Sequence, residues 1–206
     1  MAEATGVLVL GDVSGDSLGP TSREMLAAGR RVADDLREEL AIGLLGDTLT
    51  APLQQAISHG ADKVYAVTHP LLGKYQVDLY LAAMEALCRE VNPRVILMGR
   101  TTEGRELAPR LAFRLGAGLA QDCLEIKVDP ATRELLANRP VYGGNAIAVV
   151  SCNYTPQIAA IRPKVYEPLT PDASRQGQVV SFPVELAPSI VRSRVVDVVK
   201  EEAAGV

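Results

Sequence analysis

Two short polar segments carry residue types that could bind an anion or perform acid–base chemistry. The first, residues 100–105, reads RTTEGR and joins an apolar run to a helix-like run. Backbone N–H groups at a helix start bind anions, and two guanidinium groups would add charge and planar hydrogen-bond donors. Either threonine could cap the helix, although a cap with two solvated arginines fits equally well. The candidate ligand residues are Arg100, Thr101, Thr102, Gly104 and Arg105.

The second segment is the loop at residues 11–19, which contains Asp12 and Asp16. Paired carboxylates can serve as general acid and general base, but a polar turn explains these two more simply. The sequence has no GxSxG elbow, no GxxxxGK[ST] phosphate loop and no Cys–His pair with the spacing of a nucleophile family. We therefore expect a protein that is not an enzyme and has no catalytic residues of its own.

Composition narrows the class of partner. The chain has 21 Lys+Arg against 25 Asp+Glu, a net charge of −4, which leaves no excess of basic residues for a nucleic acid. No apolar run is long enough to cross a membrane. His59 and His69 are not grouped with other ligand types, so we expect no metal site. The cysteines lack CxxC spacing, which indicates reduced thiols in a cytoplasmic protein; they are Cys88, Cys123 and Cys152.

Strands and helices alternate over the first 115 residues. Short apolar runs predict strands at residues 7–10, 41–45, 63–68 and 94–98. Apolar stripes at helical spacing predict a helix from Pro20 with a stripe reaching Leu40, and further helices at residues 52–59, 77–91 and 103–115. Thr21 and Glu24 have the spacing of a capping box. This alternation predicts a mostly parallel, twisted sheet with helices on both faces, a Rossmann-like three-layer α/β fold.

The pattern changes after Gly116. Four strand-like runs joined by turns, without a helix between them, predict an antiparallel extension; they lie at residues 124–128, 134–140, 147–151 and 157–161. The YGGN sequence at residues 142–145 fits a tight turn. A polar linker at residues 168–177 precedes one more strand-like run, residues 178–186. We expect one domain over residues 1–190 and a charged terminal segment over residues 191–206.

Several separated motifs occur in an order that resembles one known family. The motifs ILMGRTTEGRELAPRLAFRLGAGLAQDC, RPVYGGNAIA and PQIAAIRPKVYEP, with the LVLGD start and the terminal VVDVVKEE, are similar to the N-terminal domain of the electron transfer flavoprotein alpha subunit. Members of that family usually continue into a second domain that holds FAD. This chain stops at Val206, so it is expected to be either one domain of such a subunit or a short form whose flavin domain is on another chain. No FAD-contacting residue is therefore carried over.

The resemblance implies an electron-carrier role shared with other chains. The domain would pack on a beta subunit and help to shape a flavin or nucleotide site for electron transfer between flavin-dependent dehydrogenases and an acceptor. FAD would belong to the complete heterodimer, and AMP or a second FAD to the beta subunit. Residues 100–105 would then contact the partner's flavin. Isolated from its partner, the chain could form a homo-oligomer through the same face.

Two other functions fit the sequence. In the first, residues 10–19 and 99–105 hold AMP or ATP at the strand ends of a stand-alone nucleotide-binding domain. In the second, the chain is an assembly module without a ligand. A ligand between the two loops would favour the nucleotide-binding domain, and a large exposed apolar face would favour a subunit or an assembly module.

Overall fold

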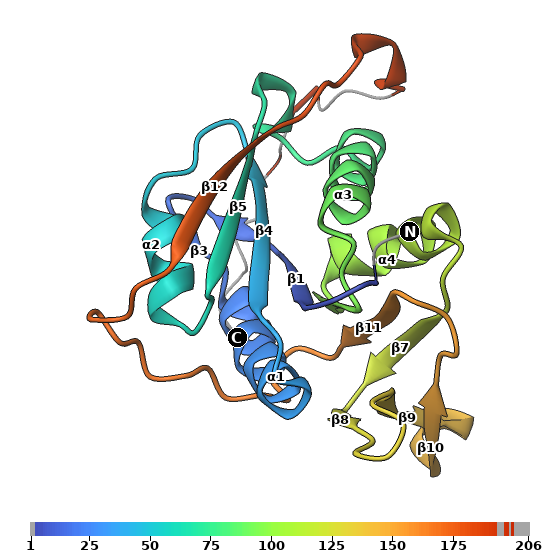
Figure 1. Ribbon diagram of the computed structural model, residues 1–206. Coiled ribbons are helices and arrows are strands. Elements are labelled where there is room, and N and C mark those ends of the chain that lie inside the picture. The colour runs from blue at the N-terminus through green and yellow to red at the C-terminus, as the bar shows by residue number, and fades with distance from the viewer. Residues whose placement is uncertain (1–2, 193–195, 198, 200–206) are drawn as a thin grey trace, which may run out of the picture.

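Seven parallel strands form the central sheet of the computed structural model, which describes residues 3–192, 196, 197 and 199. Their order across the sheet is β12-β5-β4-β1-β6-β11-β7 (Figure 1). Every neighbouring pair in this order is parallel, which confirms the predicted sheet type. The strands are β1 (Val7–Gly11), β4 (Leu40–Gly46), β5 (Lys63–Thr68), β6 (Val95–Gly99), β7 (Leu119–Cys123), β11 (Gln157–Ile161) and β12 (Gln178–Pro183).

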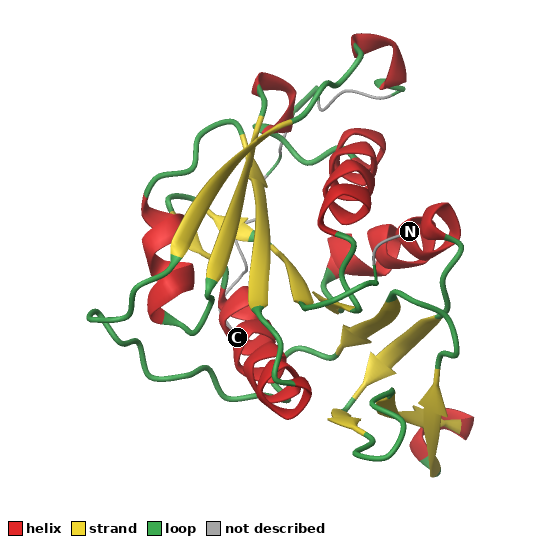
Figure 2. Cartoon of the chain, in the orientation of Figure 1, coloured by secondary structure: helices red, strands yellow, loops and turns green. Residues whose placement is uncertain are grey.

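Helices cover both faces of this sheet and complete the three-layer fold (Figure 2). Successive side chains of a strand point to opposite faces, and β1 shows the result. Its residues Val7 and Val9 join the core under α1 and α2, whereas Leu8 and Leu10 join the core under α3 and α4. The helices are α1 (Pro20–Leu36), α2 (Ala51–Ser58), α3 (Val77–Val91) and α4 (Thr102–Leu115), with short 3-10 turns η1 (Pro70–Leu72) and η3 (Pro188–Ile190).

Two small antiparallel sheets are attached to the central sheet. The strands β8 (Glu125–Val128), β9 (Leu135–Val141) and β10 (Ala146–Ser151) form the larger one, which confirms the predicted antiparallel extension. The predicted tight turn is also confirmed, because the turn η2 (Tyr142–Gly144) joins β9 to β10. A two-stranded hairpin, β2 (Val13–Ser14) and β3 (Ser17–Leu18), follows β1.

The structure corrects the prediction for two strands after residue 116. Residues 157–161 were expected in the antiparallel extension, but they form β11, which lies between β6 and β7 and runs parallel to both. All five of its residues are buried, as is typical of a strand inside a parallel sheet. Parallel neighbours need a long crossover, and the three-stranded antiparallel sheet supplies that crossover between β7 and β11. The strand β7 itself was not predicted.

The first helix begins at Pro20 as predicted, but the predicted capping box is wrong. Gly19 is the N-cap residue and no side chain caps the helix, so Thr21 does not act as the cap. The carboxylate of Glu24 is buried and accepts a hydrogen bond from the backbone N–H of Lys164 at 2.6 Å. The side chain that the local pattern assigned to the cap therefore binds a backbone group 140 residues further along the chain.

The same helix ends four residues earlier than its apolar stripe suggested. It stops at Leu36, and Arg37 takes a left-handed conformation with φ of 57°. Leu40 continues the helical spacing in sequence, but it begins β4 and pairs with Val7 of β1. Burial of Leu40 in the sheet, rather than in the helix, explains why the stripe overran the helix.

The end of the chain leaves two expectations open. The predicted terminal segment, residues 191–206, lies mostly outside the described residues. The predicted domain boundary at residue 190 therefore stays a prediction. In the part of the chain that the structure describes, none of the helices has the length and apolar character to cross a bilayer.

Candidate functional site

The loop after β6 is held tightly against the end of that strand. Gly104 is buried, and a Cβ atom at this position would lie only 1.9 Å from the carbonyl oxygen of Gly99. Glycine is therefore required here for close packing of backbone on backbone. Thr101 is the N-cap residue of α4, and its Oγ1 accepts a hydrogen bond from Gly104 N at 3.1 Å. The predicted threonine cap is confirmed, and it holds the first turn of α4 at the strand ends.

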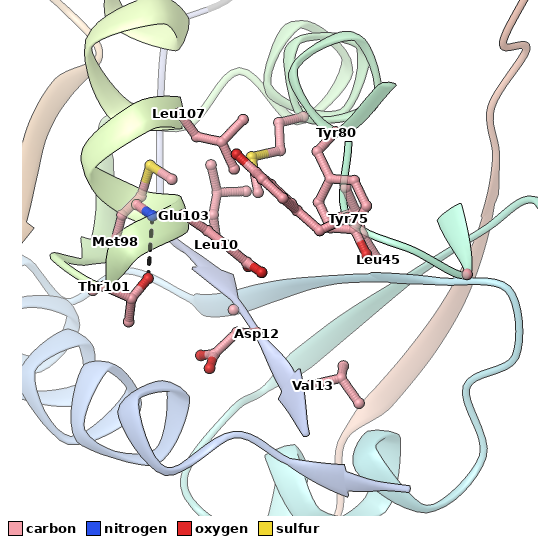
Figure 3. A pocket seen from close by; sticks show the side chains of 15 residues that line it. Leu10, Asp12, Val13, Leu45, Tyr75, Tyr80, Met98, Thr101, Glu103 and Leu107 are labelled. Atoms are coloured by element: carbon pink, nitrogen blue, oxygen red, sulfur yellow. Dashed lines mark hydrogen bonds between the residues drawn. The ribbon is translucent and has the colours of Figure 1, made fainter. Parts of the chain in front are cut away.

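A cavity of about 220 Å³ opens at the carboxyl ends of β1, β4 and β6 (Figure 3). This edge is where open α/β sheets bind ligands. Leu10, Leu45 and Met98 contribute apolar walls, and the loop after β6 closes one side. The cavity is smaller than the roughly 300–1,000 Å³ of typical small-molecule sites. Its size therefore suits a small ligand or bound water rather than a dinucleotide.

Two carboxylates give this cavity a negative character. Asp12 enters it from the loop after β1, and Glu103 enters it from the first turn of α4 (Figure 3). Burial raises the pKa of Glu103 above its ordinary value, and the nearby negative charge of Asp12 raises it further. Asp12 is held in place by Ser22, whose hydroxyl donates to its carboxylate. Among the residues that line the cavity, all within the described chain, none is Lys, Arg or His.

Two tyrosines complete the wall on the α3 side. The rings of Tyr75 and Tyr80 pack edge to face, with centroids 5.1 Å apart. The Tyr75 hydroxyl donates to Glu106 of α4 at 2.9 Å, and the Tyr80 hydroxyl donates to the Leu72 carbonyl at 3.0 Å. Burial raises the pKa of Tyr75, and it raises the pKa of Tyr80 to about 12. Both phenols therefore stay protonated at neutral pH and add no charge to the cavity.

The structure turns Arg100 away from this cavity. Its backbone N–H donates to Ile161 O at 2.7 Å, and its guanidinium lies 3.5 Å from a carboxylate oxygen of Asp122. Arg162 makes a two-bond contact with the same carboxylate, at 2.9 and 2.8 Å. These hydrogen bonds from Arg162, and the charge of Arg100, lower the pKa of Asp122. Arg100 therefore belongs to an ion-pair cluster at the ends of β6, β11 and β7.

Asp122 is a residue that the sequence reasoning missed. It lies where the register between β7 and β11 shifts, and it has a left-handed φ of 62°. A β-bulge of this kind re-aims a side chain, and here it presents a carboxylate to two arginines. An Asp within a short, weakly apolar run was the available signal. Glu103, Tyr75 and Tyr80 were also missed, because nothing in their local sequence separates them from ordinary helix and loop residues.

The remaining candidates lie on the surface of α4. Thr102 and Arg105 are both exposed in the first turn of the helix. Within the described chain, the guanidinium of Arg105 has no hydrogen-bond or ion-pair partner. The five predicted residues therefore separate into three groups: Thr101 and Gly104 build the turn, Arg100 pairs with Asp122, and Thr102 with Arg105 faces outward. Whether they contact a cofactor stays a prediction.

The two histidines make hydrogen bonds with backbone atoms, and the thiols of Cys88 and Cys123 are buried. His59 makes a 2.8 Å hydrogen bond to Gln55 O, and the ring of His69 accepts from Leu71 N at the start of η1. Burial raises the pKa of Cys88 and of Cys123 to about 12, so neither thiol is activated. In the described residues, no three His, Cys, Asp or Glu side chains are grouped to hold a metal ion.

The fold and the position of the cavity define an open α/β protein with its candidate site at the carboxyl ends of central parallel strands. The sequence profile of a family described as "Electron transfer flavoprotein domain" matches residues 7–187. The chain belongs to this electron transfer flavoprotein family, as its motifs predicted.

Curated relatives share its sequence over nearly its whole length. It is 36% identical to "Electron transfer flavoprotein subunit alpha" of Clostridium acetobutylicum, over 97% of this chain. It is 35% identical to "Protein FixB" of Clostridium saccharobutylicum, over 98% of this chain, and 33% identical to the alpha subunit of Bacillus subtilis, over 97%. In each case the chain spans about 60% of the relative's own length.

Proposed function

We propose that this chain is the part of an electron transfer flavoprotein alpha subunit that packs on a beta subunit and helps to shape a flavin or nucleotide site. Electrons would pass between a flavin-dependent dehydrogenase and an acceptor through the flavin of the complete assembly. The match of the family profile to residues 7–187 is the observation that carries this proposal. The chain would position a partner's cofactor and would catalyse no reaction itself.

The cavity at the strand ends does not suit FAD or a nucleotide. A phosphate placed there would meet the carboxylates of Asp12 and Glu103 without a basic side chain to offset them. A volume of about 220 Å³ is also too small for FAD. These features argue against the stand-alone AMP- or ATP-binding domain, and they favour a cofactor that is held mainly by another domain or subunit.

Arg105 and Thr102 are the best-placed residues to meet such a cofactor. Both are exposed, and Arg105 has a charge that no described residue neutralises. A guanidinium near a flavin ring stabilises the anionic reduced form and raises the reduction potential. Arg100 would contribute less, because Asp122 already offsets its charge.

The redox potential of the flavin in the assembled complex tests this role. One charge about 8 Å from the flavin, at an effective dielectric constant of about 40, is worth about 1 kcal/mol, or about 20 mV for a two-electron couple. Arg105→Ala should therefore lower the potential by about 20 mV. The matched control is Arg114→Ala, an exposed arginine in the last turn of the same helix. Equal potentials for wild type and Arg105→Ala would remove Arg105 from the flavin contact.

A further inference from the structure

Residues 168–191 wrap around one edge of the central sheet and contact the layers on both of its faces. Residues 168–177 lie against the end of α2, residues 178–183 form β12 beside β5, and residues 184–191 pack on the core under α3 and α4. We call residues 168–191 the belt. In Figure 1 the belt is the orange to red part of the chain that follows β11, with β12 at the outer edge of the sheet.

The belt buries little of its own surface. Among residues 168–191, all of which the structure describes, only Leu186 is buried, whereas all five residues of the preceding strand β11 are buried. Phe182 and Val184 are half-buried against the core under α3 and α4. Segments with few buried apolar contacts and solvent-exposed backbone hydrogen bonds open at a lower free energy than the core of a domain. The belt therefore combines the features of a segment that opens before the rest of the chain unfolds.

One carboxylate fixes the belt to the layer of α1 and α2. Asp62 lies directly before β5, and its carboxylate accepts a hydrogen bond from the guanidinium of Arg175 in the belt at 2.6 Å. The same carboxylate accepts from the guanidinium of Arg30 in α1 at 2.8 Å and from the backbone N–H of Leu40 at 2.9 Å. Three segments that are distant in sequence therefore meet at Asp62. We call the pair of Asp62 and Arg175 the latch.

A tight turn within the belt places Arg175 for this contact. The carboxylate of Asp172 accepts from the backbone N–H of Ser174 at 2.8 Å and from its hydroxyl at 2.6 Å. The backbone N–H of Asp172 donates to Ser58 O at the end of α2, at 2.9 Å. Because the turn is fixed both internally and to α2, the backbone before Arg175 is already ordered when the latch closes.

The latch and the pairing of β12 depend on the same residue. The backbone N–H of Gln178, the first residue of β12, donates to the carbonyl oxygen of Asp62 at 2.9 Å. From this point β12 pairs with β5 over six residues without a register shift. Release of Arg175 from Asp62 should therefore weaken the first hydrogen bond of β12, and the rest of the strand should follow.

We infer that the belt is a conformational device that opens as one unit and is held closed by the latch. Opening separates β12 from β5 and leaves the other six strands of the sheet paired, so that β5 becomes the edge strand. An edge strand presents unpaired N–H and C=O groups to other chains. Opening also uncovers the part of the core on which Phe182 and Val184 pack. This inference does not depend on the proposed function, because every contact that carries it lies within this chain.

Arg175→Ala tests the latch without creating an unpaired carboxylate. In this variant Asp62 keeps its hydrogen bonds from Arg30 and from Leu40 N. Loss of the arginine should therefore remove the contact with the belt and leave the other contacts of Asp62 in place. A hydrogen bond between charged groups is worth a factor of about ten or more in an equilibrium constant, so we expect the open fraction of the belt to rise about tenfold.

Hydrogen exchange of the backbone amides of the whole purified chain measures that fraction. In wild type, the amides of β12 should exchange at least tenfold faster than those of β1 at the centre of the sheet. Arg175→Ala should accelerate exchange about tenfold, by a similar factor throughout residues 168–191, and should leave β1 and β6 within twofold of wild type. The matched control is Arg89→Ala, which removes an arginine that makes two hydrogen bonds to Glu85 on α3. It should leave exchange in the belt within twofold of wild type.

Three results would overturn the inference. Amides of β12 that exchange as slowly as those of β1 would show that the belt opens only when the whole chain unfolds. An acceleration confined to the residues beside Arg175 would show that the belt frays and does not open as one unit. Equal acceleration of the belt and of β1 by Arg175→Ala would assign the arginine to global stability, and urea unfolding of the same variant would show that loss independently.

Discussion

Replacement of Gly104 by alanine should destabilise the fold, because it forces a methyl group against backbone. The new Cβ would lie 1.9 Å from the carbonyl oxygen of Gly99 and 3.1 Å from its carbonyl carbon. Ordinary contact begins near 3.4 Å, so the start of α4 and the end of β6 would have to separate by about 1.5 Å. Neither partner can escape by a change of rotamer, since the atoms of Gly99 belong to the backbone.

The expected loss of stability combines two effects that destabilise the variant and one that stabilises it. Overpacking in a close-packed region costs about 1–3 kcal/mol. Displacement of the first turn would also weaken the cap from Thr101 to Gly104 N, worth about 1 kcal/mol. Alanine is favoured over glycine inside a helix by up to about 1 kcal/mol. The loss of the cap and the gain in helix propensity about cancel, so the net prediction is that Gly104→Ala lowers the free energy of unfolding by about 1–3 kcal/mol.

Urea unfolding of Gly104→Ala and of a matched control measures this cost. Gly29 also lies within a helix, but a Cβ there would meet the end of the Leu40 side chain at 2.7 Å. Because a leucine side chain can shift, Gly29→Ala should stay within about 1 kcal/mol of wild type. A Gly104→Ala protein as stable as wild type would refute the reasoning, since the backbone contact would then not exist in solution.

Three further predictions concern the charged residues. Asp122→Asn keeps a residue that tolerates positive φ and should cost about 1 kcal/mol at pH 7. The arginines lower the pKa of Asp122 below its ordinary 3.8. The stability that the Asp122 carboxylate contributes is therefore complete above pH 3.8 and is lost as the pH falls through the lowered pKa. The free energies of unfolding of the variant and of wild type, measured in urea, should become equal at strongly acidic pH. Glu103→Gln should act in the opposite sense, because the pKa of Glu103 is raised. Ionisation of Glu103 destabilises the fold as the pH rises from the ordinary pKa of a glutamate through the raised pKa. The variant should therefore be more stable than wild type at pH 7 but not at pH 3. Arg105→Ala should lower the potential of the partner's flavin by about 20 mV, whereas the control Arg114→Ala should leave it unchanged. A potential that Arg105→Ala leaves unchanged would place the flavin elsewhere.

The sequence was most informative where burial is complete. Apart from the glycine that ends each strand, β1 and β6 are buried on both faces and read as unbroken apolar runs, and the run of β4 is interrupted only by Gly43. The strand β7 reads LAQDC and is only partly buried, which left no apolar run to find. For β11 the run was visible, but its direction depends on which strands flank it, and that is decided by tertiary packing.

The features of the candidate site that depend on neighbouring residues in the sequence could be predicted, and the contacts between distant segments could not. The Thr101 cap and the position of the loop at the strand ends follow from residues a few positions apart. The pairing of Arg100 and Arg162 with Asp122 joins segments about 20 and 40 residues apart, and it depends on a bulge that no pattern in the sequence marked. The negative character of the cavity likewise arises only when the loop of Asp12 and the helix of Glu103 meet.

The measurement that tests the central claim most directly is the visible absorbance spectrum of this chain, purified alone and after co-expression with its beta subunit. The account predicts a colourless chain when it is alone and a stable complex with flavin absorbance when the beta subunit is present. Flavin bound to the chain alone would contradict it, because the account holds that the acidic cavity of about 220 Å³ does not accept the cofactor. A chain that forms no complex with the beta subunit would contradict it equally.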